Sequence, residues 1–233
     1  MYDMWKNYKQ KKWSDHMLSD EIQKMYLAIL KEELVQATGC TEPIAIAYAA
    51  ARLRNILGKE PEKIRAEVSG NIIKNVKSVI VPNTGGLKGI AAAIAAGAIA
   101  GDASKILQVI ASVPETLHTK IADYAQTTPI EIICADTPRL LDISLTGWAD
   151  GHSAKVHIAN NHSNIIFEEK DGTVLLEKDT GNSAEDSLTD KSVLNVKDII
   201  EFANTTDLYK AGPLLEAQIN CNMTIAEEGL KNN

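Results

Sequence analysis

One segment, Gly89 to Gly101, restricts the possible fold more than any other part of this chain. It reads GIAAAIAAGAIAG and has no charged or polar side chain on any face. Because a helix needs roughly 20 apolar residues to cross a bilayer, this segment is too short to be a membrane span. Gly97 and Gly101 are four residues apart, so they share one helix face and let a second backbone approach closely. We therefore expect a central helix that closely packed neighbours bury.

The composition is that of an ordinary globular protein. The chain has 233 residues, of which 45% are hydrophobic and 24% charged, enough for a sizeable core. Its formal net charge of −7 argues against nucleic acid as a main partner, because phosphate binding needs clustered Lys and Arg. The three cysteines are odd in number and far apart, which argues against a disulfide framework and for the reducing cytoplasm. We expect neither nucleic acid nor a membrane among its partners.

The N-terminal part of the chain predicts mainly helices. Residues 1–17 lack the apolar core of a signal peptide, and we expect them to form a flexible arm. Residues 18–128 are mostly helical in pattern, with Pro43 opening the second helix. Two runs rich in Val and Ile, Lys63–Ser69 and Ile72–Val81, interrupt the helices, and we expect them to form a short β pair.

The next region, 129–180, predicts an antiparallel sheet. Apolar and polar residues alternate between Leu141 and Leu145, as expected of a strand with one buried face. The dipeptides Asp150-Gly151 and Asp171-Gly172 are typical of hairpin turns. We therefore expect an α+β fold, in which a helical layer around the buried Ala/Gly-rich helix is joined to an antiparallel β-sheet subdomain.

The last region, 181–233, predicts a polar loop followed by C-terminal helices. The loop, Thr180 to Lys191, is rich in polar residues, and the chain stops at Asn233 inside a helical pattern. That ending does not resemble a natural domain end. An isolated piece of this kind should expose apolar surface and tend to associate, so a homo-oligomer is one expectation.

One cysteine, Cys40, stands where a thiol can take part in chemistry. It follows one predicted helix and comes just before Pro43, which is favoured in the first turn of the next helix. The free N–H groups and the positive end of that helix dipole would lower the thiol pKa and favour the thiolate, which binds metals and attacks carbon. The alternative is that Cys40 is a small buried residue in a helix–helix turn.

A glycine-rich turn is the second candidate. Asn83, Thr84, Gly85 and Gly86 precede Lys88 and the Ala-rich helix. Glycines let the backbone turn tightly and aim N–H groups at an anion, and the helix start adds its dipole. A substrate carboxylate could bind there, with Asn83 or Thr84 donating and Lys88 adding charge. The alternative is a strand-to-helix turn whose glycines only permit close packing.

The remaining polar candidates are less specific. Glu42 is a candidate general acid or base, although the dipole also favours an acidic residue at a helix start. Asn71 is either a turn residue or a substrate contact. Three histidines are spaced along the predicted hairpins and do not converge on one face, so we expect no zinc site there: His152, His157 and His162. Cys134, in an apolar run, reads as a core strand residue, and neither it nor Cys221 has metal-ligand spacing to Cys40.

Several motifs occur here in one order. They are Cys40-Thr41-Glu42-Pro43-Ile44-Ala45, Ser69-Gly70-Asn71-Ile72, Val81-Pro82-Asn83-Thr84-Gly85-Gly86, Gly151-His152-Ser153-Ala154-Lys155-Val156, Asn222-Met223 and Ala226-Glu227-Glu228-Gly229-Leu230. Together they resemble the N-terminal half of the L-cysteine desulfidases, which are related to the iron–sulfur L-serine dehydratases through the serine dehydratase alpha-chain family. The resemblance covers about residues 18–233, so the chain looks truncated relative to that family.

The resemblance implies an iron–sulfur lyase of L-cysteine catabolism. In that design three cysteines hold a 4Fe-4S cluster, and the open iron acts as a Lewis acid on the leaving sulfur or hydroxyl. The products are pyruvate, ammonia and sulfide, and no pyridoxal phosphate (PLP) is needed. Cys40 matches the N-terminal cluster cysteine of the family. The other two ligands lie in the half that this sequence lacks, so we expect the cluster to be absent from this chain alone.

The same resemblance implies roles for the neighbouring residues. Glu42 and Lys88 would be catalytic. The substrate-binding residues would be Thr41, Asn71, Asn83, Thr84, Gly85 and Gly86. The substrate would be a small amino acid, cysteine or serine, and the partner would be the missing C-terminal half.

Three functions remain open at this point. The chain is a fragment of a cysteine-desulfidase-like lyase, inactive alone, or an L-serine dehydratase-like subunit of a split enzyme whose other half is a separate chain. The third reading is a non-catalytic domain that binds small molecules or assists assembly. The first two place the protein in the cytoplasm with an iron–sulfur cluster.

Overall fold

The computed structural model describes residues 18–178 and 189–231. The chain divides into two compact units, which we call the α/β unit, Gln36–Ala184, and the helical unit, Met1–Val35 with Glu185–Asn233. The N-terminal arm expected at 1–17 lies outside the described residues, as does most of the polar loop expected at 180–191.

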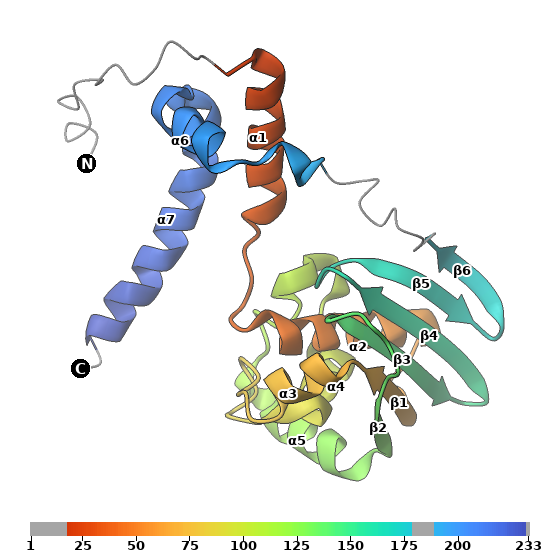
Figure 1. Ribbon diagram of the computed structural model, residues 1–233. Helices are drawn as coiled ribbons and strands as arrows, with labels where there is room; N and C mark the ends of the chain where they lie inside the picture. The colour runs from red at the N-terminus through yellow and green to blue at the C-terminus, as the bar shows by residue number, and fades with distance from the viewer. Residues whose placement is uncertain (1–17, 179–188, 232–233) are drawn as a thin grey trace. The chain divides into compact units, whose positions relative to one another are not determined.

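A six-stranded sheet forms one layer of the α/β unit (Figure 1). Its strands are β1 (Lys63–Val68), β2 (Ile130–Cys134), β3 (Asp142–Ala149), β4 (His152–Ala159), β5 (Ile165–Lys170) and β6 (Thr173–Glu177). Their order across the sheet is β2-β1-β3-β4-β5-β6. From β1 through β3 to β6 every neighbouring pair is antiparallel, and the expected α+β fold is confirmed.

One strand departs from the expected antiparallel arrangement. β2 pairs with β1 in parallel. The chain reaches β2 from β1 through a series of helices, and such a long crossover brings the chain back in the same direction. The sheet is therefore mixed, and it joins β1 to strands that the sequence assigned to a separate region.

The hairpin predictions hold. Ile143 and Leu145 of β3 are completely buried, as the alternating pattern predicted, but the polar residues Asp142 and Ser144 on the other face are buried as well. Asp150 and Gly151 have φ values of 50° and 79°, and the Asp171-Gly172 turn has 50° and 78°. Two successive positive φ values are the geometry of the tight turn that matches the twist of paired strands.

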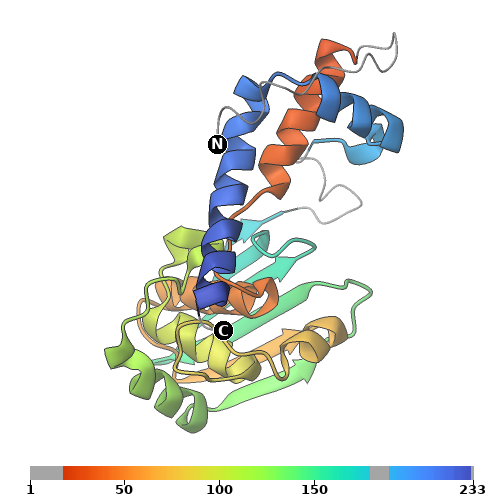
Figure 2. The ribbon, with the colours of Figure 1, turned by 90° about the vertical axis from the view of Figure 1, so that its left-hand side faces the viewer.

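Helices cover one face of the sheet in successive layers (Figures 1 and 2). α2 (Thr41–Leu57) packs on β3 and β4, α4 (Gly89–Ala100) packs on α2, and α5 (His118–Thr127) packs on α4. The short elements between them are α3 (Gly70–Val76), η2 (Ala103–Gln108) and η3 (Glu115–Leu117). Because α2 lies between the sheet and α4, its residues from Pro43 to Ala51 are buried without interruption.

The two glycines of the Ala-rich helix explain how closely α2 and α4 approach. A Cβ atom added to Gly97 would lie 2.8 Å from the Cα of Ala47, and one added to Gly101 would lie 2.8 Å from the Cβ of Ala51. The predicted close backbone approach is confirmed. Ala47 contacts Gly97, and four residues later in both segments Ala51 contacts Gly101. The helices α2 and α4 therefore run in the same direction and begin at the same end.

The second extended run expected at Ile72–Val81 is wrong over most of its length. Residues Gly70–Val76 form α3, and the Ser69 hydroxyl accepts a hydrogen bond from the Ile72 N–H at 3.4 Å. This N-cap starts a helix that β-branched residues alone would not favour. Only the end of the run stays extended, where Val79 and Val81 pair with Gly89 and Leu87.

The helical unit has a small core. Its elements are α1 (Asp20–Glu33), η4 (Lys191–Val193), α6 (Val196–Thr205) and α7 (Leu208–Lys231). Leu18, Tyr26 and Phe202 are buried together, and the two rings lie 5.2 Å apart. The Tyr26 hydroxyl donates to the Val193 carbonyl at 3.1 Å.

Among the described residues, no helix combines the length and apolar character that crossing a membrane requires.

Candidate functional site

Cys40 occupies the N-cap position of α2, directly before the first helical residue. Its side chain is exposed, and it does not cap the helix. The thiol instead donates to the Glu42 carboxylate, with 3.1 Å between Sγ and Oε2. The expectation that Cys40 stands at a helix start is confirmed, and the alternative of a buried turn residue is wrong.

The expected thiolate is wrong for the free chain. Partial burial, together with the hydrogen bond to Glu42 and the negative charge of that carboxylate, raises the pKa of the Cys40 thiol. Burial disfavours the charged thiolate, and the nearby carboxylate opposes a second negative charge. Cys40 is therefore a neutral thiol at neutral pH.

Glu42 is held from several directions. Its Oε1 accepts a hydrogen bond from the Asn75 side chain of α3 at 3.2 Å, and its Oε2 lies 3.5 Å from the Thr41 hydroxyl. Burial pushes the pKa of Glu42 upward, but hydrogen bonds from Cys40, its own N–H and Asn75 lower it overall. Glu42 is thus a charged carboxylate with a fixed orientation.

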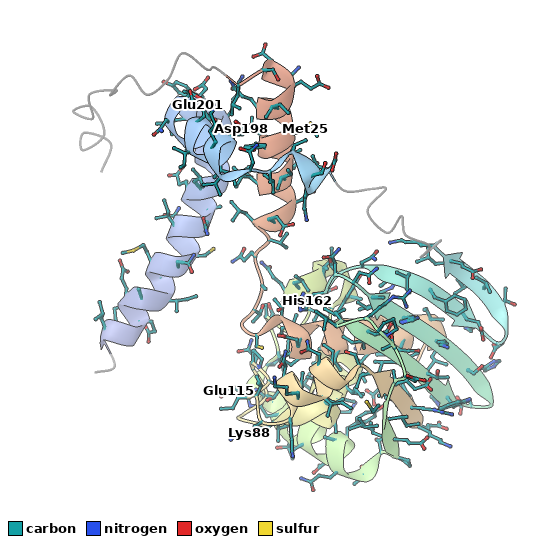
Figure 3. The ribbon with its side chains drawn as sticks, in the orientation of Figure 1. Met25, Lys88, Glu115, His162, Asp198 and Glu201 are labelled. Carbon is teal, nitrogen blue, oxygen red and sulfur yellow. The ribbon has the colours of Figure 1, made fainter. Side chains whose placement is uncertain are left out.

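His162, which the sequence analysis placed among the hairpin histidines without a role in this site, interacts electrostatically with this carboxylate. It belongs to the loop between β4 and β5, close to the start of α2 (Figure 3). Burial lowers the pKa of His162, and the charge of Glu42 offsets part of that effect. The imidazole is therefore neutral at neutral pH. It is separated from Glu42 by so many residues that no local signal could have found it.

The glycine-rich loop lies against the Cys40 turn. Gly39 has a φ of 87°, and a Cβ atom there would lie 3.1 Å from Cγ of Pro82. The loop is the tip of a short hairpin, because the Val81 N–H donates to the Leu87 carbonyl at 2.8 Å. The two motifs that the sequence singled out are therefore neighbours in the fold.

The polar side chains of this loop serve the loop itself. The Asn83 amide donates to the carbonyls of Ile110 and Ala111 at 3.0 and 3.2 Å. The Thr84 hydroxyl is buried and donates to the Val81 carbonyl at 2.7 Å. These engagements leave the backbone, rather than the side chains of Asn83 and Thr84, to face a ligand.

Gly85, Gly86 and Lys88 are exposed, as is Asn83 at the start of the loop. The two glycines have φ values of 71° and 93°, which other residues adopt only with strain. Lys88 is the N-cap residue of α4, its side chain makes no capping bond, and it is exposed (Figure 3). The start of α4 therefore has no side-chain cap, and it carries the ammonium group of Lys88.

His118 packs on the loop and was missed by the sequence analysis. Its Nδ1 would lie 3.1 Å from a Cβ atom on Gly85, and its Nε2 is buried without a hydrogen-bond partner in the described part of the chain. The contact explains why residue 85 is a glycine. Nothing in the sequence links a histidine at the start of α5 with this loop.

Asn71 lies in the first turn of α3 and is exposed. It is four residues before Asn75, so the two amides share the helix face that Asn75 turns toward Glu42. This places Asn71 on the side of α3 nearest the Cys40 site.

The other two cysteines are not partners of Cys40. Cys134 ends β2 and is exposed, so the expected core position is wrong: β2 is an edge strand of the sheet. Cys221 belongs to α7 of the helical unit. Over residues 18–178 and 189–231, no cluster of three or more His, Cys, Asp or Glu residues could hold a metal ion.

The other two histidines of the described residues pair with separate carboxylates. His152 lies 2.8 Å from Asp171, and His157 lies 2.8 Å from the buried Asp142. Arg139 contacts the other oxygen of Asp142 at 3.2 Å. These pairs are structural.

A shallow surface depression lies at the far end of α2. It is lined by Arg54, Asn55, Gly58, Lys59 and Glu60. Fourteen residues of helix separate Arg54 from Cys40, which corresponds to about 21 Å. The Arg54 guanidinium is engaged with the Ala98 and Gly101 carbonyls at 3.2 and 2.6 Å. This depression is therefore distinct from the Cys40 site and takes no part in it.

Comparison with known proteins gives one group of relatives. A UPF0597 protein of Desulfitobacterium hafniense is 48% identical over 214 residues, which cover 92% of this chain and 50% of that relative. A UPF0597 protein of Treponema denticola is 47% identical over 208 residues, covering 88% of this chain and 48% of the relative. Over these residues the chain is similar to the UPF0597 proteins. No family model and no solved structure matches it.

This finding corrects the expected family. The chain was expected to be the N-terminal half of an L-cysteine desulfidase, but the relatives that match nine tenths of it carry the UPF0597 name. The resemblance rested on short motifs, whereas these matches extend over about nine tenths of the chain. The chain spans about half the length of the UPF0597 relatives it matches.

Proposed function

We propose that this chain contributes part of the active site of an iron–sulfur lyase, which removes sulfide or water from a small amino acid such as L-cysteine or L-serine. The observation that carries the proposal is the exposed Cys40 thiol, 3.1 Å from the Glu42 carboxylate, on a turn that packs against a glycine-rich loop. A thiol, a fixed carboxylate and a free helix start meet in one place.

Cys40 is suited to hold a metal. Thiolates are the usual ligands of iron–sulfur clusters. Metal binding requires the thiol to lose its proton, and the Glu42 oxygen that already accepts its hydrogen bond is the nearest acceptor. A bound cluster would supply a Lewis acid for the leaving group. Among the described residues no group of three or more His, Cys, Asp or Glu side chains surrounds Cys40, so the proposal takes the other ligands from the polypeptide that UPF0597 relatives have beyond the matched region.

In this proposal the substrate carboxylate binds at the common start of α2 and α4. Both helices begin at the same end, and neither has a side-chain cap. The positive ends of two parallel dipoles repel each other, and a bound anion relieves that repulsion. Gly85 and Gly86 let the backbone approach the anion, and Lys88 adds a positive charge.

His162 is the best candidate to accept the α-proton. Its lowered pKa keeps the imidazole neutral at neutral pH, so one ring nitrogen has a free lone pair. Glu42 beside it would stabilise the imidazolium that forms. Loss of the β-substituent then gives an enamine that hydrolyses to pyruvate and ammonia. Because no step requires an aldehyde cofactor, the proposal includes no PLP, and it places the protein in the reducing cytoplasm.

The test is to co-express this chain with the part of the D. hafniense relative that it does not span, without oxygen. The complex should hold iron and acid-labile sulfide and release pyruvate from L-cysteine or L-serine. Cys40→Ser should remove both the iron and the turnover. Cys134→Ser, a matched control at an exposed thiol, should change neither.

Two results would contradict the proposal. One is full iron content and activity in the Cys40→Ser complex. The other is a wild-type complex that holds the cluster but turns over neither amino acid. A His162→Gln complex separates the roles further, because it should keep its iron and lose most of its kcat.

A further inference from the structure

The helical unit exposes more large apolar side chains than the larger α/β unit does. Most of the large exposed hydrophobic side chains of the described residues belong to it, although it is the smaller unit. Soluble monomers seldom leave such side chains in a continuous patch unless a partner covers them.

On α7 some of these side chains form a narrow stripe, and Tyr209 and Ile225 lie outside it. Apolar residues recur every three or four positions along one face of the helix: Ala211, Leu215, Ile219, Met223, Ala226 and Leu230. A stripe of one apolar residue per turn is the pattern of a seam between two helices.

The stripe changes from buried to bare along α7. Ala211, near the N-terminal end of α7, is 4% exposed. Within the helical unit α7 contacts α1. Further along, Ile219 is 52% exposed, Met223 49% and Leu230 75%. The bare part therefore continues an interface that the unit already uses. From Ile219 to Leu230 it extends about 17 Å, long enough to seat three turns of another helix.

We propose that this bare stripe of α7 docks the additional polypeptide of the UPF0597 proteins, through an apolar helix face. The matched relatives are about twice as long as the region they share with this chain, so a partner of the right size exists in the same polypeptide. The stripe continues the α1–α7 contact, so that partner would complete a helical bundle that α1 begins. This inference rests on the comparison and the geometry of α7, and it is independent of the proposed lyase activity.

The test mixes the purified chain with the separately purified remainder of the D. hafniense relative and measures the complex by light scattering after size exclusion. We expect a one-to-one complex. Ile219→Asp and Met223→Asp should each weaken it at least about tenfold, since a charge would enter an apolar seam. Thr224→Asp is the control, because Thr224 lies on the opposite face of the same helix and should leave the affinity unchanged. Circular dichroism should show the same helix content in all variants.

Three outcomes would overturn the inference. The first is that the two polypeptides form no complex, or form one whose affinity is unchanged by Ile219→Asp and by Met223→Asp. The second is self-association of this chain that the stripe variants abolish, because the occupant would then be a second copy. The third is a cross-link from position 223 that returns to residues of the same chain instead of the added polypeptide.

Discussion

The two units of this chain differ in the size of their buried cores. In the α/β unit a single core joins the sheet, α2 and α4, and a long series of side chains is completely buried. In the described part of the helical unit the buried cluster consists of Leu18, Tyr26 and Phe202, while much of α7 is exposed. The difference shows that the α/β unit has an extensive core of its own, whereas the described part of the helical unit buries few side chains.

The largest expected difference between the two units is in the free energy of unfolding after one methyl group is added to a glycine. Gly97→Ala should destabilise the α/β unit by about 3 kcal/mol or more, because the new Cβ would collide with the backbone of Ala47. Gly229→Ala on α7 is the matched change in the helical unit. It meets no atom within 4 Å, and alanine favours the helix by about 0.5–1 kcal/mol.

Urea titrations of both variants, followed by circular dichroism and hydrogen exchange, would measure the difference. Equal, small effects in the two units would show that α2 and α4 are not packed backbone to backbone.

Acid is expected to have an intermediate effect on the stability of the α/β unit. Burial alone would raise the pKa of Asp142, but His157 and Arg139 lower it overall. A lowered pKa in the folded state stabilises the fold above the ordinary value near 3.9, and this contribution is lost as the pH falls through the folded-state value. The α/β unit should therefore lose stability below about pH 4.

The Asp142→Asn variant should be less stable at pH 7 by about 1–3 kcal/mol and should show a flatter pH dependence in this range. Asp136→Asn, an exposed carboxylate on the neighbouring loop, serves as control and should follow the wild type. An unchanged acid transition in Asp142→Asn would contradict the assignment.

The smallest effect concerns the reactivity of Cys40. Glu42→Gln removes the negative charge that raises the pKa of the thiol, so the thiolate fraction at neutral pH should increase. Alkylation of Cys40 by iodoacetamide, mapped by mass spectrometry, should become about three- to tenfold faster. The rate at Cys134 in the same sample should not change. Equal Cys40 rates in both proteins would show that Glu42 does not control the thiol.

Much of the α/β unit could be predicted from its sequence. Alternation from Leu141 to Leu145, two Asp-Gly turns and the glycines of the Ala-rich helix each depend on neighbours along the chain, and each was confirmed. The parallel pairing of β2 was not predicted, because it depends on a long crossover through helices. α3 was missed because its residues prefer strands, and the cap at Ser69 outweighed that preference.

The site was only partly predictable, for a similar reason. The position of Cys40 at a helix start follows from Pro43, two residues into the helix. Its pKa was misjudged although Glu42 stands two residues away, since the dipole was weighed and the nearby carboxylate was not. His162 and His118 come from distant segments, and only the fold brings them to the site.

Hydrogen exchange of the chain alone, then with the remainder of the D. hafniense relative, tests the central claim most directly. In the isolated chain, amides of α2 and α4 should exchange far more slowly than those of α7 beyond Ile219, because only the α/β unit has a complete core. Adding the second polypeptide should protect α7 and leave the interior of α2 unchanged. Equal protection of α2 and α7 in the isolated chain, or no gain in α7 on addition, would contradict the account.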